Sequence, residues 1–433
     1  MRRKAAFKTL GCRLNQFETD SLVTDFHKAG YDIVGFNEKA DVYIINTCTV
    51  TNQSDRKSKY FINQASRLAD KNSVLVVTGC MVSSQQDYFR SNNTITYAVD
   101  NKRKRSVLAI VNGHFNSEIF DLQNLQENSF GFSVVEKSFH TRSAIKIQDG
   151  CNNYCSYCIV PEVRGRATSR PVKDILENAR RLLELGSKEI VLTGVNISRY
   201  KYRGIHFDDL VEQIVDLPGE FRIRISSVEP EGFTDKLIAL FGHPKLCPHL
   251  HLCLQSGSNK VLTRMRRFYT IEQYMSIIEK FRSIYPNFNF TTDIIVGFPG
   301  ETEAEFQETY AAIERIGFSH IHTFKYSRRA RTRAKMMIDQ VSEKVKNERS
   351  KIIRTLSDKM KLDYRRKFIG KEQNVLIERI NLKGEARGYG EHYIPVRIKN
   401  TSATKNTFYK VRIADILTDA EYSASGHFIC HSG

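Results

Sequence analysis

Short apolar runs alternate with amphipathic segments over the first 80 residues of the chain. The runs KAAFKTL, DVYIINT and SVLVVTG occupy residues 4–10, 41–47 and 73–79. Between them, residues 15–30 and 52–70 carry apolar side chains at the spacing of one helical face. Strands that alternate with helices form βαβ units, so the pattern predicts an open parallel sheet flanked by helices.

A second alternating series begins near residue 143. Strand-like runs lie at 143–149, 189–196, 221–229, 249–257, 289–298 and 320–327, with helical patterns such as 171–186 and 303–317 between them. A closed eight-stranded barrel needs about 250 residues, more than this series contains. The pattern therefore predicts a partial (β/α)6 barrel.

The pattern changes again after residue 340. Residues 341–367 predict one long charged helix, and the runs at 372–380, 393–400 and 408–417 alternate like strands of a small antiparallel β-barrel. Residues 101–140 open on the basic run NKRKR and continue with weak periodicity, which predicts a connector. We therefore expect an α/β protein with three domains, at residues 1–135, 136–366 and 367–433.

Charge and cysteine content narrow the functional class. The net charge of +18 favours a polyanionic partner, most often nucleic acid. No apolar run approaches the roughly 20 residues of a membrane span, and the first residues lack the apolar stretch of a signal peptide. We therefore expect a cytoplasmic protein without a membrane partner, in which nine cysteines indicate metal or redox chemistry rather than disulfides.

Three cysteines follow the three strands predicted in the first 80 residues: Cys12, Cys48 and Cys80. The carboxyl ends of parallel strands share one edge of a sheet, where ligands bind. We therefore expect these cysteines to meet in space, although buried cysteines that act only as small apolar residues are the simpler alternative.

A second set of cysteines is concentrated in CNNYCSYC, at Cys151, Cys155 and Cys158. These residues follow the first strand of the predicted barrel, at the face where barrel active sites lie. Thiolates at this density suit zinc or an iron–sulfur cluster, and no fourth ligand stands at the usual zinc spacing. A four-iron cluster held by three cysteines leaves one iron free for a substrate or cofactor.

The segment GCNNYCSYC followed by IVPEVRGRATSRP resembles the motif of the radical S-adenosylmethionine (SAM) superfamily. Taken with the first three cysteines and the last β-barrel, nearly the whole chain resembles the methylthiotransferase family. The resemblance implies two 4Fe-4S clusters, SAM bound at the second one, and a TRAM-like RNA-binding module at residues 367–433. It also implies SAM contacts at the predicted strand ends, at Thr193, Gly194, Asn196, Glu229, Gln255, Ser256, Gly257, Asp293, Ile295 and Gly297.

The segment KTLGCRLNQFETD most resembles the branch of this family that acts on threonylcarbamoyladenosine in tRNA, because other branches usually have Gln or Pro in place of Arg13. The resemblance implies methylthio transfer to the adenine C2 beside the anticodon. The implied partners are the tRNA anticodon stem-loop, an electron donor such as flavodoxin or ferredoxin, and a sulfur source. Isopentenyladenosine in tRNA, an aspartate of a ribosomal protein, and a non-catalytic zinc- and RNA-binding role are the alternatives.

Four further features are less specific. The loop at 327–334, SRRARTRA, departs from the Ser-x-Arg-x-Gly-Thr-x-Ala pattern of similar enzymes because it has no Gly, which leaves its backbone geometry open. The segment TRMRRFYT could hold phosphates or border SAM through Arg264, Arg266, Arg267 and Tyr269. Cys247, Cys253 and Cys430 fit no ligand pattern. Basic and aromatic residues of the last domain suit RNA, at Lys383, Arg387, Arg397, Lys399, Lys405, Lys410, Arg412, Tyr389, Tyr393 and Tyr409.

Overall fold

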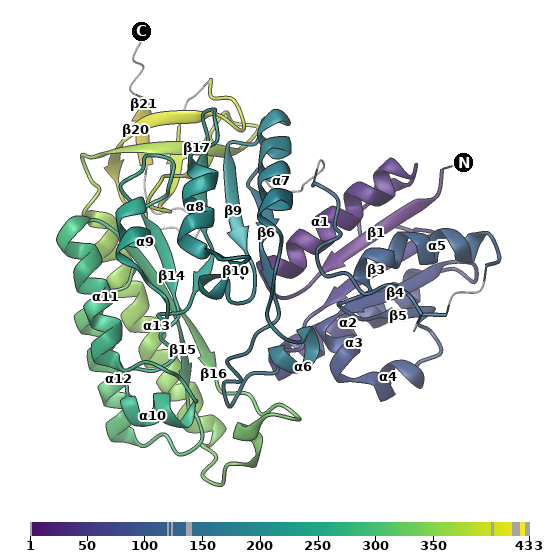
Figure 1. Ribbon diagram of the computed structural model, residues 1–433, viewed down its shortest axis with the longest axis horizontal. Helices are drawn as coiled ribbons and strands as arrows, with labels where there is room; N and C mark the ends of the chain where they lie inside the picture. Colours follow the sequence, from purple (N-terminus) through teal and green to yellow (C-terminus); the bar gives the residue numbers. More distant parts are fainter. Residues whose placement is uncertain are drawn as a thin grey trace.

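The computed structural model describes residues 2–118, 121–122, 124–135, 141–399, 402–417 and 425–428, the last of these by their backbone. Figure 1 shows three successive parts, with a purple and blue α/β layer beside a teal and green barrel and a yellow β-barrel above it. Their sheets lie within residues 4–99, 143–325 and 372–428. The predicted α/β fold class is confirmed.

The first sheet has five parallel strands in the order β2-β1-β3-β4-β5. Both of its faces are covered by apolar cores, to which Ile44 and Ile45 of β3 contribute on opposite sides. The strands are β1 (Lys4–Thr9), β2 (Asp32–Val34), β3 (Val42–Thr47), β4 (Val74–Gly79) and β5 (Tyr97–Val99). The helices are α1 (Arg13–Lys28), α2 (Asn52–Leu68), α3 (Cys80–Ser84), α4 (Gln86–Arg90) and α5 (Val107–Phe115), preceded by η1 (Lys104–Ser106).

Helix α5 corrects the prediction of a connector over residues 101–140. Val107, Ile110 and Val111 of this helix are fully buried in the core on one face of the first sheet. The preceding basic run contributed to that prediction, because we interpreted it as part of the connector. Lys104 within that run is fully buried and pairs with Glu18.

The central part is a partial barrel of six parallel strand positions, as predicted. Strands β6, β9 and β12 form one sheet, and β13, β14, β15 and β16 form the next. The third of the six strand positions is made of two short strands, β12 and β13, which belong to different sheets. An isolated parallel β-bridge pairs Ile223 of β12 with Leu246, which precedes β14, and links the two sheets. The strands are β6 (Ser143–Lys146), β9 (Glu189–Thr193), β12 (Arg222–Ile225), β13 (Ser227–Val228), β14 (His249–Leu252), β15 (Asn289–Val296) and β16 (His320–Lys325).

Helices cover the outside of these strands (Figure 1). The predicted charged helix is α13 (Glu343–Arg366), which packs against β16. The other helices of this part are α6 (Val160–Arg164), α7 (Val172–Glu184), α8 (Phe207–Val215), α9 (Asp235–Leu240), α10 (Asn259–Arg264), α11 (Ile271–Ile284) and α12 (Glu303–Ile316), with 3-10 turns η2 (Ile197–Arg199) and η3 (Arg333–Met336). Two short two-stranded pairs are β7 (Gln148–Asp149) with β8 (Thr168–Ser169), and β10 (Lys201–Tyr202) with β11 (Ile205–His206).

The last part is a closed barrel in the order β17-β18-β19-β21-β20. Its pairs are antiparallel except for β19 with β21. It sits on the first residues of two central strands, because Arg222 donates to the Asn374 and Tyr389 carbonyls at 2.9 Å each and Asn289 donates to the His392 carbonyl. Its strands are β17 (Glu372–Ile380), β18 (Ala386–Tyr389), β19 (Pro395–Ile398), β20 (Phe408–Asp415) and β21 (Ser425–Phe428). None of the described helices is long and apolar enough to cross a membrane.

Candidate active site

The first three cysteines lie at one edge of the first sheet, as expected from strands that run in parallel. Cys12 precedes α1, Cys48 follows β3 and Cys80 begins α3. Gly11 has a φ of +93°, and a Cβ atom there would lie 2.7 Å from the Cys48 Cβ, so only glycine allows this close approach. Burial, together with the nearby thiols of Cys80 and Cys12, raises the pKa of Cys48 to about 11.

The second three cysteines also lie together, directly after β7. Burial and the neighbouring Cys155 raise the pKa of Cys158 to about 12. Three N–H groups donate to sulfur atoms of this set: the Asn153 backbone amide to the Cys151 Sγ at 3.4 Å, the Asn196 side-chain amide to the same sulfur at 4.0 Å, and the Arg267 guanidinium to the Cys155 Sγ at 3.2 Å. Such donors stabilise negative charge on sulfur, as cluster-bound thiolates require.

The spacing of the sulfur atoms bears on which metal centre fits. Within the described residues, the one group of three metal-capable side chains whose ligand atoms all lie within 4.8 Å of one another is His251, Cys253 and Asp293. Neither cysteine trio is as compact. A single zinc ion with bonds of about 2.3 Å would hold tetrahedral sulfur ligands about 3.8 Å apart. A multi-iron cluster binds each thiolate on a different iron, so both trios fit a cluster better than a zinc ion.

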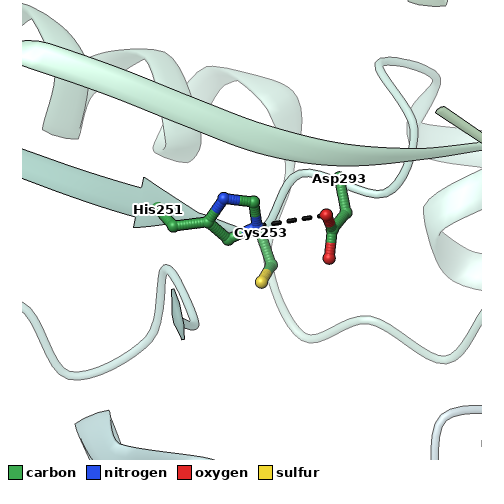
Figure 2. A group of neighbouring side chains, drawn as sticks. All are labelled: His251, Cys253 and Asp293. Carbon is green, nitrogen blue, oxygen red and sulfur yellow. Dashed lines mark ion pairs between the residues drawn. The ribbon is translucent and has the colours of Figure 1, made fainter. Parts of the chain in front are cut away.

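The compact group of His251, Cys253 and Asp293 lies at the carboxyl end of β14 and within β15. Figure 2 shows the His251 ring facing the Asp293 carboxylate, with Cys253 alongside; the His251 Nε2 and Asp293 Oδ1 are 3.1 Å apart. The second ring nitrogen of His251 hydrogen-bonds the Thr291 hydroxyl at 3.0 Å. Cys247 and Cys253 are both buried, Cys253 belongs to this compact group, and Cys430 lies outside the described residues.

A buried ionic network connects the first sheet to the barrel beside the first trio. Glu18 of α1 is fully buried and pairs with Lys104, with Lys146 at 2.9 Å and with Arg164 at 3.0 Å. Asp149 pairs with Lys146 at 2.6 Å and Arg164 at 3.1 Å. Burial alone would raise the pKa of Glu18, but Arg164, Lys104 and Lys146 outweigh it and hold the pKa well below its usual value.

This network also affects the first trio. Three cations against two carboxylates leave one positive charge without a carboxylate, and both Arg164 and Lys104 attract the Cys80 thiolate. A buried positive charge favours thiolates and an anionic cluster. Sequence reasoning missed these residues. The sequence held one signal for a buried charge network. Glu18 lies four residues from both Leu14 and Leu22, so it occupies the apolar face of α1 that is buried.

A cavity of about 190 Å³ lies beside the second trio and reaches the loop that follows Cys48. Cys158 lines it, and so do Val50 and Thr51. Cys80 also packs against Ile159, the residue after Cys158. Three of the predicted SAM contacts, Gln255, Asp293 and Ile295, line this cavity, together with Tyr157, Ile159, Val160, Phe324, Lys325, Tyr326 and Ser327.

Two other predicted contacts lie beside the second trio. The Asn196 amide nitrogen is 4.0 Å from the Cys151 Sγ. Glu229 pairs with Arg267, the arginine that donates to Cys155. Gln255 has a φ of +67°, a costly conformation for a residue other than glycine and one often found at functional sites.

The remaining predicted contacts, Thr193, Gly194, Ser256, Gly257 and Gly297, are engaged in packing within the protein. Ser256 is fully buried and its hydroxyl bonds the Thr309 hydroxyl at 3.1 Å, while Gly257 packs against α12. Gly297 packs against the Lys346 side chain. Thr193 is buried at the end of β9, and Gly194 lies against the Gln148 carbonyl. These positions shape the backbone around the cavity.

The basic segment at 264–269 lies mostly inside the protein. Arg264 forms two hydrogen bonds to Glu305, at 3.0 and 2.7 Å, and the Tyr269 hydroxyl donates to the Leu254 carbonyl at 2.8 Å. Arg267 is bound to Glu229, so Arg266 is the exposed cation of this set. The segment therefore borders the second trio rather than offering four groups to RNA phosphates.

The loop at 327–334 spans both trios. Arg329 is buried, donates to the Thr49 hydroxyl at 2.7 Å and pairs with Asp55 at 2.8 Å, so it does not add to an RNA-binding surface. On the other side, the Ala334 amide donates to the Ser156 carbonyl at 2.8 Å. Arg331, at the position where similar enzymes have Gly, keeps a left-handed φ of +64°. The glycine geometry is thus retained without glycine.

Comparisons with known proteins agree with this arrangement. Residues 145–313 match the Radical SAM superfamily, and residues 4–99 match the uncharacterized protein family UPF0004. The threonylcarbamoyladenosine tRNA methylthiotransferase MtaB of Thermotoga maritima is 36% identical over 98% of this chain and 97% of its own length. The tRNA-2-methylthio-N(6)-dimethylallyladenosine synthase of Thermoanaerobacter sp. (strain X514) is 36% identical over 86% of this chain and 82% of its own.

A solved structure supports the fold. The radical S-adenosylmethionine methyltransferase TsrM from Kitasatospora setae, with cobalamin and a [4Fe-4S] cluster bound, aligns with a TM-score of 0.54 at 14% identity. The alignment covers 75% of this chain and 72% of that one.

Proposed function

Because the chain belongs to the radical SAM methylthiotransferase family, we propose that it transfers a methylthio group to the adenine C2 of threonylcarbamoyladenosine, next to the anticodon of tRNA. It is a transferase, and its cofactors are SAM and 4Fe-4S clusters. The observation that carries the proposal is the proximity of the two cysteine trios: Cys80 of the first packs against Ile159, which follows Cys158 of the second, and a cavity beside Cys158 is also lined by Val50 and Thr51, which follow Cys48. A transfer reaction that joins two cofactor centres needs this arrangement.

The cysteines divide into two roles in this proposal. Cys151, Cys155 and Cys158 hold the cluster that binds SAM, and Cys12, Cys48 and Cys80 hold the cluster associated with the sulfur to be delivered. Bound SAM and its cluster supply a 5′-deoxyadenosyl radical, which is needed because the adenine C2–H is not acidic enough for a general base.

The protein's own groups position these cofactors. Arg267 donates to Cys155 and holds the Glu229 carboxylate in place beside it, which fixes one polar contact for SAM. Gln255, Asp293 and Ile295 offer polar and apolar walls for the rest of that ligand. Arg329 ties the loop at 327–334 to Thr49 and Asp55, and Ser327 of the same loop lines the cavity, so these contacts hold part of the cavity wall in place.

The substrate assignment rests on relatives and on charge. Four relatives named for threonylcarbamoyladenosine are 35–37% identical over 91–98% of this chain, and four named for dimethylallyladenosine are 31–36% identical over 86–93% of it. The net charge of +18 suits tRNA better than a ribosomal protein aspartate. The chemistry also consumes electrons and sulfur, so we include a reduced flavodoxin or ferredoxin and a sulfur donor as partners.

The substrate is tested by mass spectrometry of tRNA nucleosides from cells with and without the gene. We expect 2-methylthio-threonylcarbamoyladenosine to disappear when the gene is deleted. Loss of the methylthiolated isopentenyl nucleoside instead, or a methylthiolated aspartate with unchanged tRNA, would contradict the proposal.

The cofactor assignment is tested with purified, anaerobically reconstituted protein and a reductant. The wild type should cleave SAM to 5′-deoxyadenosine, and Cys155→Ala should not, because one thiolate of the SAM-binding cluster is lost. Cys247→Ala, a buried cysteine away from both trios, is the matched control and should keep wild-type cleavage. Unchanged cleavage in Cys155→Ala would refute the assignment.

A further inference from the structure

A second and larger cavity, of about 450 Å³, lies between strands β12 to β16 and the carboxyl-terminal barrel. Asp293 lines both this cavity and the smaller one beside the second trio, so the two meet at its side chain. Arg13, which directly follows Cys12, lines the larger cavity as well. Its volume falls in the range of roughly 300–1,000 Å³ that is typical of small-ligand pockets.

The charge of this cavity suits an anionic ligand. Within the described residues, neither Arg13 nor Arg365, which also lines the cavity, forms an ion pair with a carboxylate, and the one carboxylate in the cavity wall, Asp293, faces His251. The Arg13 guanidinium donates instead to the Tyr393 hydroxyl at 2.8 Å, which Arg142 also contacts at 3.0 Å. Burial would raise the pKa of Tyr393, but Arg13, Arg142 and Arg224 outweigh it and lower that pKa, as expected in a strongly positive environment.

Two histidines contribute to the wall of the same cavity. The Nδ1 atoms of His249 and His320 are buried, so these atoms do not reach the cavity surface. Burial lowers the pKa of both histidines, to about 4 for His320, so neither adds positive charge at pH 7. The positive charge of the cavity wall therefore comes from Arg13, Lys361 and Arg365.

We propose that this cavity receives the target nucleoside and that the Arg13 guanidinium binds the carboxylate of its threonyl group. This inference rests on the proposed function and names the group that selects the substrate. Threonylcarbamoyladenosine has a carboxylate on its N6 substituent, and the isopentenyl group has none. A guanidinium binds a carboxylate through two parallel N–H···O bonds, and the Arg13 position next to Cys12 keeps the held base beside the first trio.

The test measures binding of the full-length protein to three anticodon stem-loop RNAs at one salt concentration. The RNAs differ only at the target base, which is threonylcarbamoyladenosine, its methyl ester or adenosine. We expect the wild type to bind the free acid at least tenfold more tightly than the ester, and Arg13→Gln to lose that preference while its affinity for the adenosine RNA stays unchanged. Arg13→Lys should keep part of the preference, because lysine offers charge without the planar fork.

Arg56→Gln is the matched control, since Arg56 is an exposed arginine of α2 that does not line the cavity, and it should retain the full preference. Equal weakening for all three RNAs in Arg13→Gln would overturn the inference, because Arg13 would then bind a backbone phosphate. Equal affinity of the wild type for the free-acid RNA and the methyl-ester RNA would also overturn the inference. If tRNA nucleosides show methylthiolated threonylcarbamoyladenosine in either case, the proposed function stands while the role of Arg13 does not.

Discussion

Arg331 occupies a backbone conformation that glycine usually provides. Its φ of +64° costs a residue with a Cβ atom about 1–2 kcal/mol. Its guanidinium pairs with Glu162, but both side chains are largely exposed, and such a pair contributes about 0–1 kcal/mol. The loop that spans the two trios is therefore held in place by contacts on either side of Arg331 rather than by this residue.

We predict that Arg331→Gly raises the free energy of unfolding by about 0.5–1 kcal/mol, since relief of backbone strain exceeds the added flexibility of the unfolded chain. Differential scanning calorimetry measures the change in melting temperature. Arg328→Gly, in the same loop but without a positive φ, is the control and should lower it. Shifts of both variants in the same direction would contradict the strain argument.

Glu18 is the residue on which the buried network between the first sheet and the barrel depends. Its neutral replacement would leave Lys104, Lys146 and Arg164 facing Asp149 alone. Removing one partner of a buried ion pair destabilises a protein by about 3–5 kcal/mol, because a buried charge loses its compensation. We therefore expect Glu18→Gln to lower the melting temperature strongly at pH 7, whereas Glu314→Gln, on an exposed position of α12, should not.

Glu18 and its neighbour Asp149 also make the stability of the folded protein depend on pH. The folded-state pKa values of Glu18 and Asp149 are lower than normal, despite burial, because of the surrounding cations. Their stabilisation is therefore complete above the unfolded carboxyl pKa of about 4 and is lost as the pH falls further. The melting temperature of the wild type should fall more steeply than that of Glu18→Gln below about pH 4. Parallel curves would show that other carboxylates dominate acid unfolding.

At the scale of elements, the carboxyl-terminal barrel presents exposed lysines to solvent. Lys383, Lys399 and Lys405 are exposed, whereas Lys410 pairs with Glu372 at 2.7 Å, and Tyr409 packs against the barrel core. Tyr389 and Tyr393 stack on each other with centroids 4.9 Å apart and face the larger cavity instead. The unpaired lysines are thus the groups of this barrel best placed to contact RNA phosphates.

Replacing Lys383, Lys399 and Lys405 with Gln should weaken tRNA binding and reduce the salt dependence of the affinity. Each lost phosphate contact on single-stranded RNA lowers the slope of log K against log salt by about 0.7, so a reduction of about 2 is expected. Equilibrium binding between low and physiological salt measures the slope. Gln substitutions of Lys71, Lys173 and Lys260, which are exposed outside this barrel, are the control. An unchanged slope would mean that the barrel does not contact the RNA backbone.

The elements that sequence predicted well are those with a strong local pattern. The apolar runs ending at Cys12, Cys48 and Cys80 became β1, β3 and β4, because a strand buried on both faces needs a continuous apolar run. Strands β2 and β5 have three residues each, too short for a pattern.

Glu18 pairs with residues 86 to 146 positions away in sequence, so its partners follow from the packing of the sheet against the barrel and not from local order.

At the scale of the whole molecule, two sets of contacts fix the first sheet against the barrel around the trios. One is the network of Glu18 with Lys146 and Arg164, and the other is Arg329 with Thr49 and Asp55. Each trio also has contacts from its own part of the chain, since Gly11 fits against Cys48 and Asn153 donates to Cys151. We therefore expect each trio to bind its iron–sulfur cluster independently of the other, while methylthio transfer needs both clusters.

We predict that converting Cys12, Cys48 and Cys80 together to Ala lowers bound iron roughly by half, because one of two clusters is lost. SAM cleavage to 5′-deoxyadenosine should stay measurable, since Cys151, Cys155 and Cys158 are unchanged, but the tRNA product should lack the methylthio group. Iron and sulfide analysis, nucleoside mass spectrometry and the cleavage assay separate these effects, with Cys247→Ala as the control that keeps full iron. Full iron content in the triple variant would show that the first trio holds no cluster, and the meeting of three strand ends would then be structural alone.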